Sequence, residues 1–85
     1  MSELTKLPNI GKELEKQLKE IGINSYDDLV NCGSQETWLK IKKMDPSSCY
    51  NKLMALEGAI QNIRWHDLSL KDKKHLKDFY EKNKK

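Results

Sequence analysis

The sequence predicts an all-α protein built as a single domain over residues 1–85, with about five short helices. Apolar residues recur at a spacing near 3.6 through almost the whole chain, as they do along one face of a helix. Alternating β-branched stretches bounded by turns, which would indicate strands, are missing. A length of 85 residues suits one small domain with a modest core and is too short for two.

Proline and glycine delimit the first elements. A short turn over residues 2–7 is expected to stop at Pro8. A helix is expected over residues 11–21 and to end at Gly22, which suits the left-handed residue that follows many helices. The apolar face of this helix carries Leu14, Leu18 and Ile21.

Two helices with recognisable N-terminal caps follow. Either Asn24 or Ser25 is expected to cap the first of them, which ends at Gly33, because Ser25 and Asp28 form an S-x-x-D pattern. Ser34 is expected to cap the second. The side chains expected to face inward in the first helix are Tyr26, Leu29 and Val30. The second helix carries the apolar side chains Trp38, Leu39, Ile41 and Met44.

Asp45 followed by Pro46 predicts the start of the longest helix, over residues 46–63. Gly58 lies inside this helix at a cost of about 1 kcal/mol relative to alanine, which suggests that another helix approaches the backbone closely there. Its apolar stripe carries Cys49, Leu53, Leu56, Ile60 and Ile63.

Ser69 and Asp72 predict a capping box for the last helix, which belongs to a basic C-terminal segment over residues 70–85. Its inward-facing side chains are expected to be Leu76, Phe79 and Tyr80.

Composition restricts the class of protein. Sixteen Lys and Arg against thirteen Asp and Glu give a net charge of +3, and 34% charged with 36% hydrophobic residues is typical of a soluble globular domain. No apolar run approaches the roughly 18 residues of a membrane span, and the first residues lack a signal-peptide pattern, so a cytoplasmic protein without a membrane role is expected. Cys32 and Cys49 do not form a disulfide framework; Cys49 is expected in the core and Cys32 to be partly exposed.

The positive charge is concentrated at the end of the chain. Residues 71–85 hold seven lysines against three acidic residues, a balance of +4, whereas the first seventy residues have a balance of −1. These lysines predict a basic edge that could follow a phosphate backbone, although no aromatic residues interleave them as in a single-strand stacking platform. The alternative is a solvated face that keeps a small domain soluble. The seven are Lys71, Lys73, Lys74, Lys77, Lys82, Lys84 and Lys85.

Residues 7–12, with the sequence LPNIGK, resemble the corner of a helix-hairpin-helix motif. Such a corner exposes backbone N–H groups at the start of the second helix, where the helix dipole helps them to hold a phosphate. Gly11 would allow close approach of the phosphate, Ile10 would plug into the core and Lys12 would add charge. Asn9 replaces the motif's first glycine; it tolerates a left-handed backbone but is expected to place a side chain near the phosphate path.

The alternative role of this corner is packing alone. Between residues 7 and 23, three lysines are balanced by three glutamates, and net basic charge supplies most of the affinity for phosphate.

A second resemblance covers nearly the whole chain. The strings LPNIGKELEKQLKEIGINSYDDL, CYNKLMAL, EGAI and RWHDL, in this order, are similar to the C-terminal domain of the TfoX/Sxy family of bacterial competence regulators. This resemblance implies a compact helical domain of helix-hairpin-helix type in a bacterial cytoplasmic protein, with a link to DNA transformation or transcriptional co-activation. Full-length regulators of the family carry a separate N-terminal domain, so either a stand-alone copy or an excised one is expected here.

Catalytic and metal-binding interpretations are disfavoured. Trp65-His66-Asp67 lacks a nucleophile motif for the histidine to activate. Trp65 is instead expected to pack between the helix over residues 46–63 and the last helix, while Asp67 and Ser69 share the capping. The four residues that could bind zinc do not have the sequence spacing typical of zinc sites. They are Cys32, Cys49, His66 and His75.

The leading hypothesis is therefore a non-catalytic module, without metal or cofactor, that contacts duplex DNA weakly and without sequence preference. The alternative is a protein-interaction or self-association module, such as a homodimer, because the first seventy residues are near neutral and five short helices would not bury every large side chain, Trp38 and Met54 among them. The predicted phosphate-contacting residues are Asn9, Ile10, Gly11, Lys12, Lys16, Lys71, Lys74 and Lys77.

Overall fold

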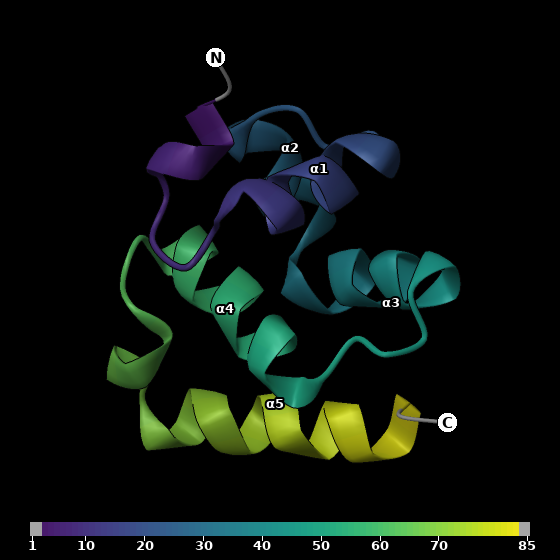
Figure 1. Ribbon diagram of the computed structural model, residues 1–85. Helices are drawn as coiled ribbons and strands as arrows, with labels where there is room; N and C mark the ends of the chain where they lie inside the picture. Colours follow the sequence, from purple (N-terminus) through teal and green to yellow (C-terminus); the bar gives the residue numbers. More distant parts are fainter. Residues whose placement is uncertain (1–2, 84–85) are drawn as a thin grey trace.

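Five α-helices and two short 3-10 helices form the protein in the computed structural model, which describes residues 3–83 (Figure 1). In this part of the chain there is no strand, and the predicted all-α class with five helices is confirmed. Ser2, predicted in the opening turn, and the tail lysines Lys84 and Lys85 lie outside the described residues. The elements are η1 (Glu3–Lys6), α1 (Lys12–Glu20), α2 (Tyr26–Cys32), α3 (Ser34–Met44), α4 (Tyr50–Gln61), η2 (Trp65–Asp67) and α5 (Leu70–Asn83).

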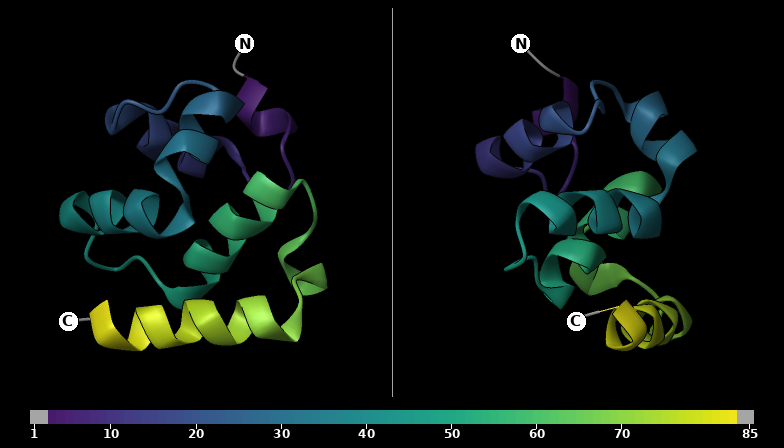
Figure 2. Two further views of the ribbon diagram at one scale, coloured as in Figure 1. Left: turned by 180° about the vertical axis from the view of Figure 1, so that it is seen from behind. Right: turned by 90° about the vertical axis from the view of Figure 1, so that its right-hand side faces the viewer.

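Helix α4 is the centre of the fold. It contacts α2, α3, α5 and η2, and it separates α1 and α2 at one end of the molecule from α5 at the other (Figures 1 and 2). The largest fully buried side chains come from η1, α1, α2, α3 and α4, and the largest of them, Trp38, lies in α3 beside α4. None of the helices within residues 3–83 has the length and apolarity required to cross a bilayer.

Two of the predicted N-terminal caps are confirmed, whereas those at Ser34 and Asp45 are wrong. Ser25 Oγ accepts the Asp28 N–H at 3.1 Å, and Ser69 Oγ accepts the Asp72 N–H at 3.0 Å. Ser34 does not cap α3, because the cap position is taken by Gly33 with φ +83°, and the Ser34 hydroxyl instead donates to the Glu57 carboxylate at 2.7 Å. The cap of α3 is thus a backbone turn without a side-chain acceptor.

The pair Asp45-Pro46 does not begin a helix, contrary to the prediction. Asp45 Oδ1 accepts the Ser47 N–H at 3.1 Å and the Ser47 hydroxyl at 2.5 Å, and the Asp45 carbonyl accepts the Ser48 N–H at 3.1 Å. These local bonds satisfy the groups that a helix start would have used, so the segment forms a turn.

Helix α4 therefore begins at Tyr50 and ends at Gln61, where Asn62 takes a left-handed conformation at φ +60°. At 12 residues it is shorter than the 14-residue α5, so the prediction that it is the longest helix is wrong. Cys49 precedes the helix as its N-cap and is exposed, which corrects its expected place in the core, whereas Cys32 is half-buried as predicted.

Three expectations about burial are also corrected. Val30 was expected to face inward but is 43% exposed, and Met44 is 41% exposed. The seven-residue α2 buries a single position, Leu29, and Val30 lies one step around the helix from it, while Met44 is the last residue of α3. Conversely, Trp38 and Met54 are buried, so neither supplies the exposed apolar surface that was expected for a protein partner.

Candidate functional site

The corner between η1 and α1 is sharp and packed against the core. The Leu7 N–H bonds to the Leu4 carbonyl at 3.0 Å, Asn9 has φ +70°, and Gly11 is the N-cap of α1. Ile10 is 6% exposed and lies in the core as predicted. The element before the corner is a single 3-10 turn, so the full helix-hairpin-helix interpretation remains a prediction.

The side chain of Asn9 faces the interior of the fold, which corrects its expected position near a phosphate path. Its Nδ2 donates to the carbonyl of Ile63 at 3.0 Å and more weakly to that of Ala55 at 3.4 Å. Its Oδ1 accepts the backbone N–H of Trp65 at 3.2 Å. One amide thus closes the N-terminal corner onto the segment between α4 and η2.

Gly58 is the position where this closure is tightest. A Cβ there would lie 2.6 Å from Asn9 Nδ2 and 2.9 Å from the Ile63 carbonyl oxygen, inside any normal contact distance. The close approach predicted at Gly58 is therefore real, but it is made by a side chain and a loop and not by another helix. A glycine within a helix was the sequence signal, and Asn9 was the partner that sequence reasoning missed.

The start of α1 presents unpaired backbone donors to solvent. The Glu15 N–H bonds to the Gly11 carbonyl at 3.0 Å, and in an α-helix the N–H groups before such a bond have no intrahelical acceptor. Gly11 and Lys12 are exposed. Lys12 and Lys16 line a shallow surface hollow together with two glutamates, Glu13 and Glu20, so this surface has no excess of positive charge.

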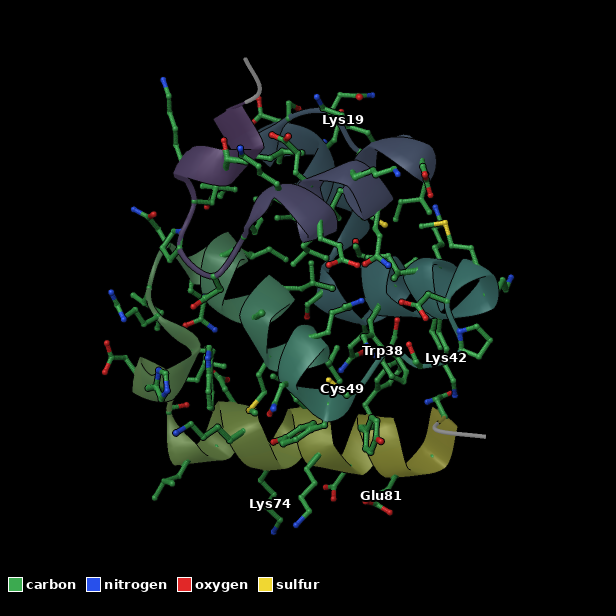
Figure 3. All side chains as sticks on the ribbon, viewed as in Figure 1. Lys19, Trp38, Lys42, Cys49, Lys74 and Glu81 are labelled. Atoms are coloured by element: carbon green, nitrogen blue, oxygen red, sulfur yellow. The ribbon has the colours of Figure 1, made fainter. Side chains whose placement is uncertain are left out.

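The lysines of α5 are in a different environment. Lys71, Lys74 and Lys77 are exposed, and within residues 3–83 no hydrogen bond or ion pair engages their ammonium groups. Lys74 points away from the body of the protein (Figure 3). Lys73, by contrast, donates to the His66 carbonyl at 3.0 Å and ties the start of α5 to η2.

The structure does not bring the two predicted groups of phosphate-contacting residues together. Residues 9–12 and Lys16 lie at the corner and on α1, whereas the three lysines lie on α5, and α4 stands between the two helices (Figure 1). A single flat surface containing both groups is therefore not formed.

The histidine of η2 is engaged with its neighbour. The His66 ring stacks on Trp65 with centroids 3.8 Å apart, and Trp65 packs against the core. In the described part of the chain, no three side chains of the His, Cys, Asp or Glu type gather as metal ligands would.

Comparisons with known proteins agree with this architecture. The family model described as the TfoX C-terminal domain matches residues 1–80. The chain belongs to this family. No curated protein matches it.

Two solved structures have the same fold as this TfoX C-terminal domain. An uncharacterised protein from Listeria monocytogenes, in a triclinic crystal form, is 47% identical with a TM-score of 0.91, over 93% of this chain and 90% of that one. A protein of unknown function from the same organism, in a tetragonal form, is 47% identical with a TM-score of 0.90, over 93% of this chain and 96% of that one. The fold is thus shared over nearly the whole length of these relatives.

Proposed function

We propose that this TfoX C-terminal domain is a non-catalytic binding module whose helix α5 contacts the phosphate backbone of duplex DNA weakly and without sequence preference. The observation that supports this is the presence of three exposed lysines, Lys71, Lys74 and Lys77, with no internal partner within residues 3–83. Their spacing of three residues keeps consecutive ammonium groups along one side of the helix. Each phosphate that such a lysine neutralises releases a counterion, which favours binding at low salt.

The corner at Asn9 is assigned a packing role in this proposal. Its side chain is used by the backbone of residues 63–65, and the surrounding lysines and glutamates cancel. Contact through α5 would suit the link to DNA transformation or transcriptional co-activation that the family resemblance implies.

The test is fluorescence anisotropy with labelled random-sequence duplex DNA, titrated at several salt concentrations. Three phosphate contacts predict a slope of about −2.7 for log K against log salt. The variant Lys71→Glu/Lys74→Glu/Lys77→Glu should lose binding. A matched control, Lys12→Glu/Lys16→Glu/Lys19→Glu on α1, changes the net charge equally and should lose much less.

Two results would contradict the proposal. One is an absence of binding by the wild-type chain at low salt. The other is equal loss in the α5 variant and the α1 control, because binding would then follow net charge and not this helix.

A further inference from the structure

The surface between α3 and α5 is hollowed along most of the length of both helices. Two adjoining hollows of about 460 and 490 Å³ share Glu36 and Leu39 and so form one continuous groove. Its α3 wall comes from residues 35, 36, 39, 42 and 43, which lie on one face of that helix. Trp38 and Lys42 extend from α3 toward α5 in this region (Figure 3).

The floor of the groove is apolar and incompletely covered. Leu39 and Phe79 are half-buried, and Leu76 is 3% exposed. The Phe79 ring is fixed edge-on against Trp38, with centroids 6.1 Å apart. This floor is part of a rigid aromatic contact between α3 and α5, so the groove is a formed feature of the fold.

One end of the groove is acidic. Glu57 and Asp72 are held together by Gln61, whose Nε2 donates to Glu57 Oε2 at 2.6 Å and to Asp72 Oδ2 at 3.0 Å. Within residues 3–83 neither carboxylate has an ion-pair partner. Two unneutralised carboxylates at this end attract a basic group from outside the chain.

The other end of the groove is basic. It is lined by Lys42, Lys43 and Lys82, with the Lys42 ammonium group bonded to the Asn83 carbonyl and 5.2 Å from the centre of the Trp38 ring. Lys43 and Lys82 are exposed. The groove therefore has opposite charge at its two ends, with Leu39 and the exposed Glu36 between them.

We infer that this groove is a self-association surface, in which a second copy of the chain packs antiparallel across a twofold axis. In a twofold interface the same patch meets itself, so residue i contacts residue j and j contacts i. An antiparallel arrangement places the basic end of each copy on the acidic end of the other, and helix α5, as one wall of the groove, lies in the groove of its partner. Charge complementarity at both ends thus follows from one sequence, whereas an unrelated partner would need the reverse polarity by coincidence.

The interface combines an apolar floor with charged ends that are accessible to solvent, so a weak dimer is expected. Its charges are exposed, so association should weaken as salt rises from about 0.01 M to about 0.15 M and the screening length falls from roughly 30 Å to roughly 8 Å. The inference stands independently of DNA contact, because it uses the groove side of α5 and not Lys74 or Lys77.

Sedimentation equilibrium of the full chain tests the inference. The wild type should form a salt-sensitive dimer. Lys43→Glu/Lys82→Glu should raise the dimer dissociation constant by about tenfold or more. Lys74→Glu/Lys77→Glu, a matched change on the outer face of α5, should leave the constant within about threefold of the wild-type value.

Charge exchange gives the sharpest result. Glu57→Lys/Asp72→Lys alone should be monomeric, but an equimolar mixture of it with Lys43→Glu/Lys82→Glu should restore a dimer that contains one copy of each. If the first of these variants fails a circular-dichroism check of folding, Glu57→Gln/Asp72→Asn replaces it and should weaken wild-type association. A wild type that stays monomeric at low salt, or a dimer that survives Lys43→Glu/Lys82→Glu, overturns the inference.

Discussion

Replacing Asn9 with alanine is expected to destabilise the domain by about 2–4 kcal/mol. Two well-formed hydrogen bonds would be lost, to the Ile63 carbonyl at 3.0 Å and from the Trp65 N–H at 3.2 Å. Each contributes about 1 kcal/mol, and the half-buried backbone groups left behind increase the loss. Alanine at φ +70° adds about 1 kcal/mol of strain. The weak bond to Ala55 at 3.4 Å is not counted.

Urea unfolding followed by tryptophan fluorescence measures this free energy, and an unchanged slope would show that the denatured state is unaffected. Asn9→Gly is the matched control, because glycine accepts the left-handed backbone while lacking the amide. It should be more stable than Asn9→Ala by about 1 kcal/mol and still less stable than the wild type. A free energy of unfolding for Asn9→Ala within about 0.5 kcal/mol of wild type would refute the assignment of Asn9 as the closure of the corner.

Three further changes test other parts of the fold. Gly58→Ala should lower the free energy of unfolding by about 1–3 kcal/mol, although the same change in an open helix raises it by about 1 kcal/mol. In an Asn9→Gly background this loss should be smaller, because the side chain 2.6 Å from the new Cβ is absent. Strictly additive losses in the double variant would contradict this close approach. The pKa of Asp45 is lowered from 3.8 to about 2, chiefly by hydrogen bonds from Ser47 and Gln17. A pKa that is lower in the folded state stabilises the protein at a pH above the unfolded pKa, so part of the free energy of unfolding should be lost as the pH falls from about 4 to about 2. In urea titrations at a series of pH values, Asp45→Asn should make the free energy of unfolding fall less steeply over this acidic range. Thr37 Oγ1 is buried without a hydrogen-bond partner among residues 3–83. Thr37→Val should therefore raise the free energy of unfolding by about 0.5–1 kcal/mol, measured as a higher melting temperature. A lower melting temperature would indicate that the hydroxyl has a partner.

The features that sequence predicted well are local ones. The Ser25 and Ser69 caps depend on residues three positions apart, so the pattern contains all the information needed. The left-handed Gly22 after α1 follows from glycine's freedom at positive φ in the same way. The all-α class follows from a helical period repeated in every segment.

The features that sequence missed depend on competing or distant partners. Asp45-Pro46 is a good helix start in isolation, but two serines follow it and offer hydrogen bonds of a turn. Asn9 was interpreted through a motif, while its actual partners lie 54 and 56 residues further along the chain.

The candidate site shows the same limit on a larger scale. Sequence located the basic residues of α5 and the exposed start of α1, because exposure of charged residues is the rule. Whether Lys12 and Lys74 share a surface depends on how α4 separates their helices, which no local pattern encodes. The groove between α3 and α5 likewise exists only after Trp38 and Phe79 pack against each other.

The bond between Asn9 and the Trp65 amide constrains the order in which a newly made chain is completed. The acceptor and the donor that bond to the Asn9 side chain are synthesised only after 54 and 56 further residues, respectively, have been joined. Because a contact of such long range forms only after the intervening chain has been brought together, the corner before α1 must wait for the residues that follow α4. Translation of α1, α2 and α3 alone therefore yields no finished fold, because the corner before α1 closes only on residues that follow α4.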